Sequence, residues 1–151
     1  MGDWKKGRGT LGPLSPILGR WVATAAKMPD GSAGDCSRDF IAFGSGFVRL
    51  EAAWDMGARG VYREVAFFGK GDDGALACWS FTIDGKRSTG VLCDASDVHR
   101  DAIGFVAEMP AGTARSVYWP DEESADGFHF AVESKVKKGW NRFLDHRYRR
   151  A

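Results

Sequence analysis

The feature that most constrains this chain is a regular succession of short β-forming runs, each followed by turn-forming residues. Ten such runs lie between residues 20 and 149, so one strand with its turn takes about 13 residues. The expected strands are 20–28, 36–43, 47–54, 60–68, 75–83, 87–93, 102–109, 113–119, 128–136 and 140–149. The breaks are rich in Gly, Asp and Pro, and none is long enough for a crossover helix. The sequence therefore predicts an antiparallel meander.

A meander of ten strands is best accommodated in a closed barrel, because closure removes both exposed edges of the sheet. We therefore predict a single all-β barrel domain over residues 13–151, after a flexible tail over residues 1–12. Ser15, Pro16 and Gly19 predict one short helical turn before the first strand, with Ser15 as its N-cap and Gly19 as its end. The alternative is a sandwich of two five-stranded sheets.

Charge and cysteine content limit the classes of partner. The chain has 21 Lys and Arg against 20 Asp and Glu, and no apolar run approaches the roughly 18 residues of a membrane span. We expect no membrane span and no nucleic-acid partner, and interpret the basic residues of 135–150 as a solvated face. The three cysteines, Cys36, Cys78 and Cys93, are odd in number and widely spaced. This pattern favours reduced thiols in a cytoplasmic protein over a disulfide framework or a zinc site.

Alternation along the strands indicates which side chains face the interior. The inward side chains that carry the argument are Trp21, Leu50, Trp54, Trp79, Phe81, Phe105, Phe130, Trp140, Arg142, Leu144, His146 and Tyr148. The stretch 61–68 is apolar on both faces, so alternation does not decide whether Glu64 points inward. A barrel of about eight strands can already enclose a small ligand, and ten strands therefore predict a cavity.

The segment Ile17-Leu-Gly-Arg-Trp21, in which a short turn leads into a Trp on the first strand, resembles the start of calycin-type barrels. That superfamily includes fatty-acid-binding proteins and nitrobindin-like haem proteins. The last run, 139–150, is similar to the closing strand of bacterial families of unknown function in this group. The resemblance covers residues 14–150 as architecture, and it implies a ligand held in the lumen.

Fatty-acid-binding proteins hold a ligand carboxylate with an Arg on the eighth strand and an Arg-x-Tyr on the tenth. The resemblance assigns these places to Arg115 and to the segment His146-Arg-Tyr148. His146 stands where the family has Arg, and a neutral imidazole binds a carboxylate more weakly than a guanidinium does. The helical lid of that family has no counterpart, because only a short break separates the first two strands.

We therefore expect a protein that binds a small, lipid-like apolar molecule, with a carboxylate as its polar end. The expected ligand-binding residues are Arg115, His146, Tyr148, Trp21, Trp54, Trp79, Phe81, Phe105 and Phe130. No cofactor is required, and a homodimer is compatible with the sequence without being indicated by it.

Three alternatives stay open. An isomerase, cyclase or hydrolase would use His146 and Tyr148 as acid and base. The sequence alone does not assign catalytic residues. A nitrobindin-like protein would bind haem through His146. A scaffold would bind other proteins through its basic, aromatic last strand. The loop residues Asp94, Asp97, His99 and Asp101 are spaced too loosely to predict a metal site.

Overall fold

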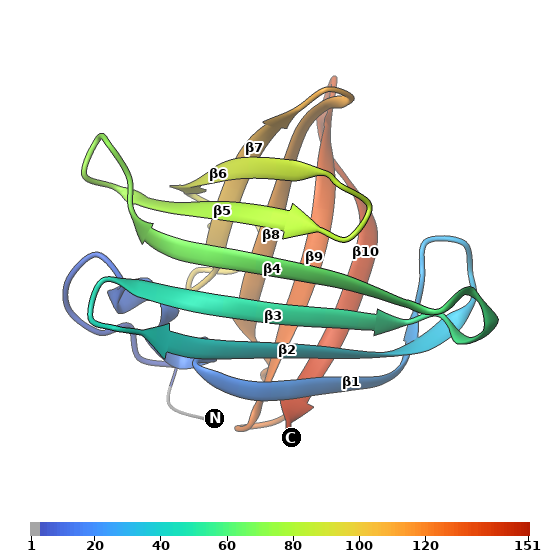
Figure 1. Ribbon diagram of the computed structural model, residues 1–151. Helices are drawn as coiled ribbons and strands as arrows, with labels where there is room; N and C mark the ends of the chain where they lie inside the picture. Colours follow the sequence, from blue (N-terminus) through green and yellow to red (C-terminus); the bar gives the residue numbers. More distant parts are fainter. Residues whose placement is uncertain (1–3) are drawn as a thin grey trace.

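The computed structural model describes residues 4–151 and shows ten antiparallel strands that close into one barrel, in the order β1-β10-β9-β8-β7-β6-β5-β4-β3-β2 (Figure 1). Each strand pairs with its neighbours along the chain, and β1 pairs with β10 to close the ring. The strands are β1 Gly19–Lys27, β2 Ala33–Phe43, β3 Phe47–Asp55, β4 Val61–Lys70, β5 Leu76–Thr82, β6 Arg87–Cys93, β7 Ile103–Met109, β8 Gly112–Pro120, β9 Gly127–Val136 and β10 Gly139–Arg150. The prediction of an all-β meander barrel is confirmed, and the two-sheet sandwich is excluded.

Turn chemistry sets the ends of the strands. Gly31 and Gly85 lie between strands and Gly112 begins β8, with φ of +89°, +85° and +128°, a region in which a side chain is strained. The break between β3 and β4 holds a single 3-10 turn, η2 Gly57–Arg59. None of the helices among residues 4–151 is long and apolar enough to cross a membrane.

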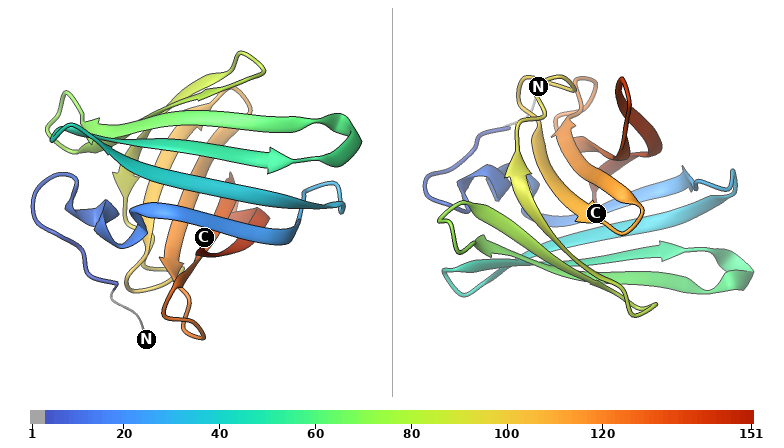
Figure 2. Two further views of the ribbon diagram at one scale, coloured as in Figure 1. Left: turned by 60° about the horizontal axis from the view of Figure 1, so that its bottom comes forward. Right: turned by 90° about the horizontal axis from the view of Figure 1, so that it is seen from above.

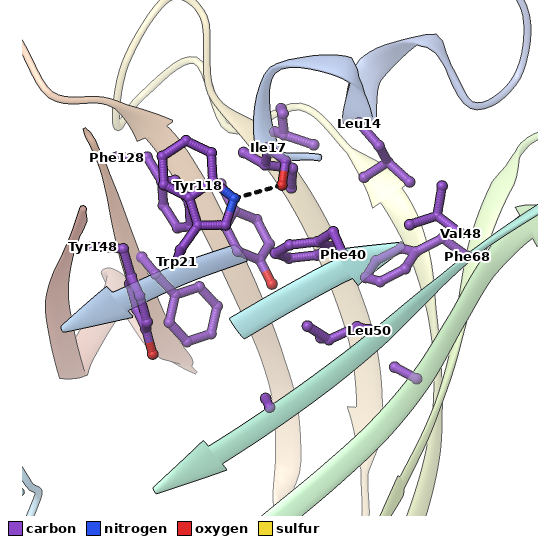
Figure 3. Close-up of a cluster of buried hydrophobic side chains, with 14 of the residues drawn as sticks. Leu14, Ile17, Trp21, Phe40, Val48, Leu50, Phe68, Tyr118, Phe128 and Tyr148 are labelled. Carbon is purple, nitrogen blue, oxygen red and sulfur yellow. Dashed lines mark hydrogen bonds between the residues drawn. The ribbon is translucent and has the colours of Figure 1, made fainter. Parts of the chain in front are cut away.

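One end of the barrel is closed by a 3-10 helix, η1 Gly12–Ile17, which starts earlier than expected. Ser15 lies inside this helix and caps nothing, while Gly19 belongs to β1. Leu14 and Ile17 are fully buried against the core, and the Trp21 Nε1–H donates to the Ile17 carbonyl at 2.9 Å (Figure 3). This helix therefore plugs the end of the barrel where the β2–β3 turn lies (Figure 1).

The flexible tail expected over residues 1–12 lies partly outside the described residues. Within residues 4–12, the Trp4 Nε1–H donates to the Asp101 carbonyl at 2.9 Å, and Gly7 and Gly12 are joined by a backbone hydrogen bond. These contacts place the segment against the end of the barrel that η1 closes.

The seam between β1 and β10 is short. Only Trp21 with Arg150 and Val22 with Arg149 are paired in register. A bulge between Ala23 and Ala26, in which Ala25 has a φ of +53°, bends the second half of β1. Beyond the bulge, the His146 Nε2–H donates to the Lys27 carbonyl at 2.9 Å, so a side chain joins the two strands where the backbone ladder stops.

Candidate functional site

The barrel contains an interior cavity of about 380 Å³. Its lining residues come from β2, β3, β4, β5, β7, β8, β9 and β10. Figure 2 shows from two further sides how these strands cross. Its walls are Arg38, Leu50, Trp54, Tyr62, Glu64, Ala66, Phe68, Cys78, Thr82, Phe105, Ser116, Tyr118, Phe130, Val132 and Phe143. A volume of this size is near the lower end of the range for small-molecule pockets.

An apolar groove of about 340 Å³ adjoins the cavity at the end of the barrel opposite η1. Met28 and Met56, from the turns after β1 and β3, line it together with Leu144. Trp54 and Tyr62 line both spaces.

Arg38 is the polar group at the centre of the cavity. It lies on β2 between Cys36 and Phe40, which share its inward face, and is 2% exposed. Its guanidinium crosses the lumen and lies 4.0 Å from the ring centre of Phe130 on β9. Its Nη2 donates to the Tyr118 hydroxyl at 2.5 Å.

The other nitrogens of Arg38 lack partners. Nε and Nη1 are buried and form no hydrogen bond, which leaves at least three N–H donors unsatisfied. No carboxylate among residues 4–151 lies within ion-pair distance of this guanidinium, although it stays protonated. Arg38 is thus a buried cation with unpartnered donors, and it is one of the residues that line the cavity.

Glu64 provides the opposite charge, from β4. Register pairs place Arg38, Ala52, Glu64 and Thr82 in one row across four strands, so all four face the lumen. The Ser80 hydroxyl on β5 donates to Glu64 Oε2 in a short hydrogen bond. This bond holds the carboxylate on the β4–β5 side, while Arg38 lies against β8 and β9. The orientation of Glu64, which alternation did not decide, is therefore inward.

Tyr118 and Tyr148 are buried beside Arg38, and their hydroxyls point away from η1 (Figure 3). Burial raises the pKa of both phenols above the ordinary value, so both are neutral donors and acceptors at physiological pH. Tyr148 stacks on Phe128, and its hydroxyl has no hydrogen-bond partner. It packs next to the cavity without lining it.

His146 is buried at the β1–β10 seam and does not line the cavity. Burial lowers its pKa, an effect that the hydrogen bond to Lys27 partly offsets. Because a carbonyl only accepts, Nε2 carries the proton of the neutral ring and Nδ1 is an unpartnered acceptor. The rings of His146 and Tyr148 are 6.3 Å apart and are not hydrogen-bonded to each other. The two side chains therefore do not form the acid–base pair that an enzyme would use.

Arg115 does not face the interior, and the expectation that it would is wrong. It lies on the outer face of β8, paired in register with Glu133 and Val106. Glu133 and Asp97 accept its hydrogen bonds at 2.6–3.0 Å, and the Trp140 ring covers it at 4.2 Å. The Arg115 guanidinium in turn lowers the pKa of Asp97. This arginine is fully paired and fixes the loop after β6 to the barrel wall.

Trp79 and Phe81 also face outward, contrary to the sequence expectation. Trp79 pairs in register with Phe67, while the inward positions of β5 are Cys78, Ser80 and Thr82. Phe81 is 49% exposed. Ser80 and Thr82 lie inside, where Ser80 binds Glu64, so apolar character alone assigned the face of this strand incorrectly.

A bulge in β10 reverses the face of its first residues. Arg142 pairs with Glu133 and Leu144 with Val132, so one extra residue is inserted between the two pairs. Leu144, His146 and Tyr148 point inward as expected, but Trp140 and Arg142 point outward and contact Arg115 and Glu133.

Of the expected ligand-binding residues, Trp54, Phe105 and Phe130 line the cavity. Trp21 points inward but packs on Phe128 in the closed end of the barrel. The sequence analysis missed Arg38 and Tyr118. The sequence does contain a signal for Arg38. It shares one face of β2 with two apolar residues, and a charged side chain is unusual on such a face.

The loop acids and His99 do not converge on one point. Asp97 binds Arg115, and His99 Nε2 contacts Glu122 Oε1 at 2.8 Å. Asp94 accepts from the backbone N–H of Ser96. Among residues 4–151, no three acidic, His or Cys side chains lie close enough together to hold a metal ion.

Comparison with solved structures finds several chains of similar fold. The crystal structure of Rv2717c from M. tuberculosis superposes with a TM-score of 0.60, covering 94% of this chain and 97% of that chain at 16% sequence identity. No protein-family model and no curated protein matches the chain. At this identity the likeness shows a shared barrel fold.

Proposed function

We propose that this barrel binds a small apolar molecule that carries an anionic group, a carboxylate, with the anion at Arg38. The observation that carries the proposal is the buried guanidinium with free donors on the wall of a cavity. The closed ten-stranded barrel agrees with it, because a barrel of about eight strands can already enclose a small ligand. The three free cysteines are compatible with the cytoplasmic location that we also propose.

The energetics favour an anion over an empty lumen. Burying an unpaired charge costs several kcal/mol, whereas the contact of Arg38 with the Phe130 ring returns about 0.5–2 kcal/mol. A hydrogen bond from a neutral hydroxyl, as at Tyr118, contributes about 1 kcal/mol. A carboxylate on the free Nε and Nη1 atoms would supply the missing countercharge and satisfy the donors. The body of the ligand would then contact Leu50, Phe105 and Phe130.

This proposal is tested by calorimetry with matched acids and amides: 3-phenylpropanoate and decanoate against 3-phenylpropanamide and decanamide. We expect the acids to bind more tightly than the amides. Arg38→Gln should weaken acid binding by about 10–100-fold, because a charged hydrogen bond is worth about 1.5–3 kcal/mol. Amide binding should change little.

Arg63→Gln is the matched control, because Arg63 is exposed on the outer face of β4. It should bind the acids as the unaltered chain does. Equal binding of acids and amides, or no binding of either, would contradict the proposal.

A further inference from the structure

We infer that the ligand carries a second polar group, a hydrogen-bond donor such as an ammonium or hydroxyl, which meets Glu64. This inference rests on the proposed function and specifies its ligand class as amphoteric: a carboxylate at one end, an apolar body and a donor at the other. The two charged side chains that would meet this ligand, Arg38 and Glu64, both line the cavity.

The first argument is electrostatic. Arg38 and Glu64 face the lumen from one register row but form no ion pair, so each presents its charge to the cavity. A plain carboxylate bound at Arg38 would place a second negative charge in the same low-dielectric space as Glu64, where like charges repel strongly. A ligand with a donor at its other end removes this repulsion and pairs both charges of the protein.

The second argument concerns positioning. Two different parts of the barrel hold the two charges apart: Tyr118 and Phe130 fix Arg38, whereas Ser80 fixes Glu64. Ser80 engages Oε2 alone, so Oε1 stays available to accept from a ligand. The apolar residues Leu50 and Phe105 line the same cavity. The cavity wall thus combines unpartnered donors, apolar side chains and an acceptor, the complement of an amphoteric molecule.

The third argument compares Glu64 with a buried carboxylate of the outer face that is paired with cations. We expect a carboxylate that only stabilises the fold to pair with a cation. Glu133 does so on the outer face, with Arg115 and Arg142. Glu64 has instead a neutral hydroxyl as its hydrogen-bond partner, and it lies beside the cavity.

The test compares three probes on the same phenyl body: 3-phenylpropanoate, 3-(4-hydroxyphenyl)propanoate and 3-(4-aminomethylphenyl)propanoate. A shorter probe, 4-aminomethylbenzoate, samples a smaller spacing between the two groups. We expect at least one donor-bearing probe to bind the unaltered chain about tenfold or more tightly than 3-phenylpropanoate. This comparison needs no variant and so does not depend on the folding of one.

Glu64→Gln should abolish the advantage of the ammonium and strengthen the binding of 3-phenylpropanoate, because the repulsion is removed. Glu51→Gln is the matched control, since Glu51 faces outward on β3 and is more than half exposed. It should leave all affinities unchanged. Circular dichroism and thermal unfolding confirm that each variant is folded before its affinities are compared.

Failure of this inference and failure of the proposed function give different results. If 3-phenylpropanoate binds through Arg38 but no donor-bearing probe binds more tightly and Glu64→Gln changes nothing, the amphoteric ligand is refuted and the anion site stands. If no carboxylate binds at all, the proposed function fails and this inference fails with it.

Discussion

Two arginines, Arg38 and Arg115, are buried in this barrel. Because their surroundings differ, we expect removal of one to destabilise the protein and removal of the other not to. Arg115 has two carboxylates and an aromatic ring around it. Arg38 has one hydroxyl and aromatic rings, with no carboxylate at ion-pair distance. A paired buried charge is costly to remove because its partners stay behind, whereas an unpaired one costs stability while it is present.

Replacing each arginine by methionine separates these cases. Arg115→Met should lower the free energy of unfolding by about 1–3 kcal/mol, because buried Glu133 loses one of its two cations and Asp97 loses its partner. Arg38→Met should leave the stability of the ligand-free protein unchanged or raise it. Urea unfolding followed by circular dichroism measures both values. A large loss on Arg38→Met, equal to that of Arg115→Met, would contradict the description of Arg38 as unpaired.

At the scale of elements, the seam between β1 and β10 is where the barrel depends on side chains. Its backbone ladder has two register pairs, and the bulge in β1 carries Lys27 away from β10. The bond from His146 to the Lys27 carbonyl spans this gap, and before the other end of β1, Arg150 Nη1 donates to the Leu18 carbonyl at 3.0 Å. Nε2 of His146 keeps its proton in either charge state, so we expect the ionisation of His146 to act on the seam through the burial of the charge.

Burial lowers the pKa of His146 in the folded protein. The unfolded chain then binds more protons, so stability is complete above about pH 6.5 and falls as pH decreases toward the folded pKa. His146→Gln retains an N–H donor for Lys27 and cannot ionise. We expect the variant to lose less free energy of unfolding than the unaltered chain between about pH 7.5 and about pH 5.

Burial also lowers the pKa of His129, which lies on the outer face. Some pH dependence of the stability should therefore persist in the His146 variant. Replacing both histidines with glutamine should remove more of the dependence than either change alone. Urea unfolding at the two pH values gives the result, and an identical pH dependence in the His146 variant would refute the coupling.

At the scale of the whole molecule, the barrel divides into a packed end and a hollow end. In the packed end, Leu14 and Ile17 of η1 belong to the same buried cluster as Trp21 and Phe128 (Figure 3). The hollow end holds the cavity and the groove beside Met28 and Met56. Stability and binding are therefore expected to depend on different residues.

Ile17→Ala tests this division. Ile17 is fully buried and does not line the cavity, so the substitution should cost about 2–5 kcal/mol of unfolding free energy. The affinity for 3-phenylpropanoate, measured at a temperature where the variant is folded, should stay within about twofold of the unaltered value. A loss of affinity comparable to that of Arg38→Gln would show that the two ends are coupled.

The sequence by itself determined the number, order and approximate ends of the strands, because turn residues and β-forming runs act locally. It also determined the faces of strands with clear alternation, such as β3 and β9, where Leu50 and Phe130 point inward as expected. These features depend only on neighbours along the chain.

Only the tertiary structure decided which charged residues form the candidate site. The bulge in β10 turns Trp140 outward, and the register of β5 turns Trp79 outward and Ser80 toward Glu64. Arg115, expected inside, lies on the outer face with Asp97 and Glu133. Arg38, for which the sequence analysis made no prediction, lies inside with Tyr118 and Phe130. Local patterns place a side chain on a strand, whereas barrel closure decides what it meets.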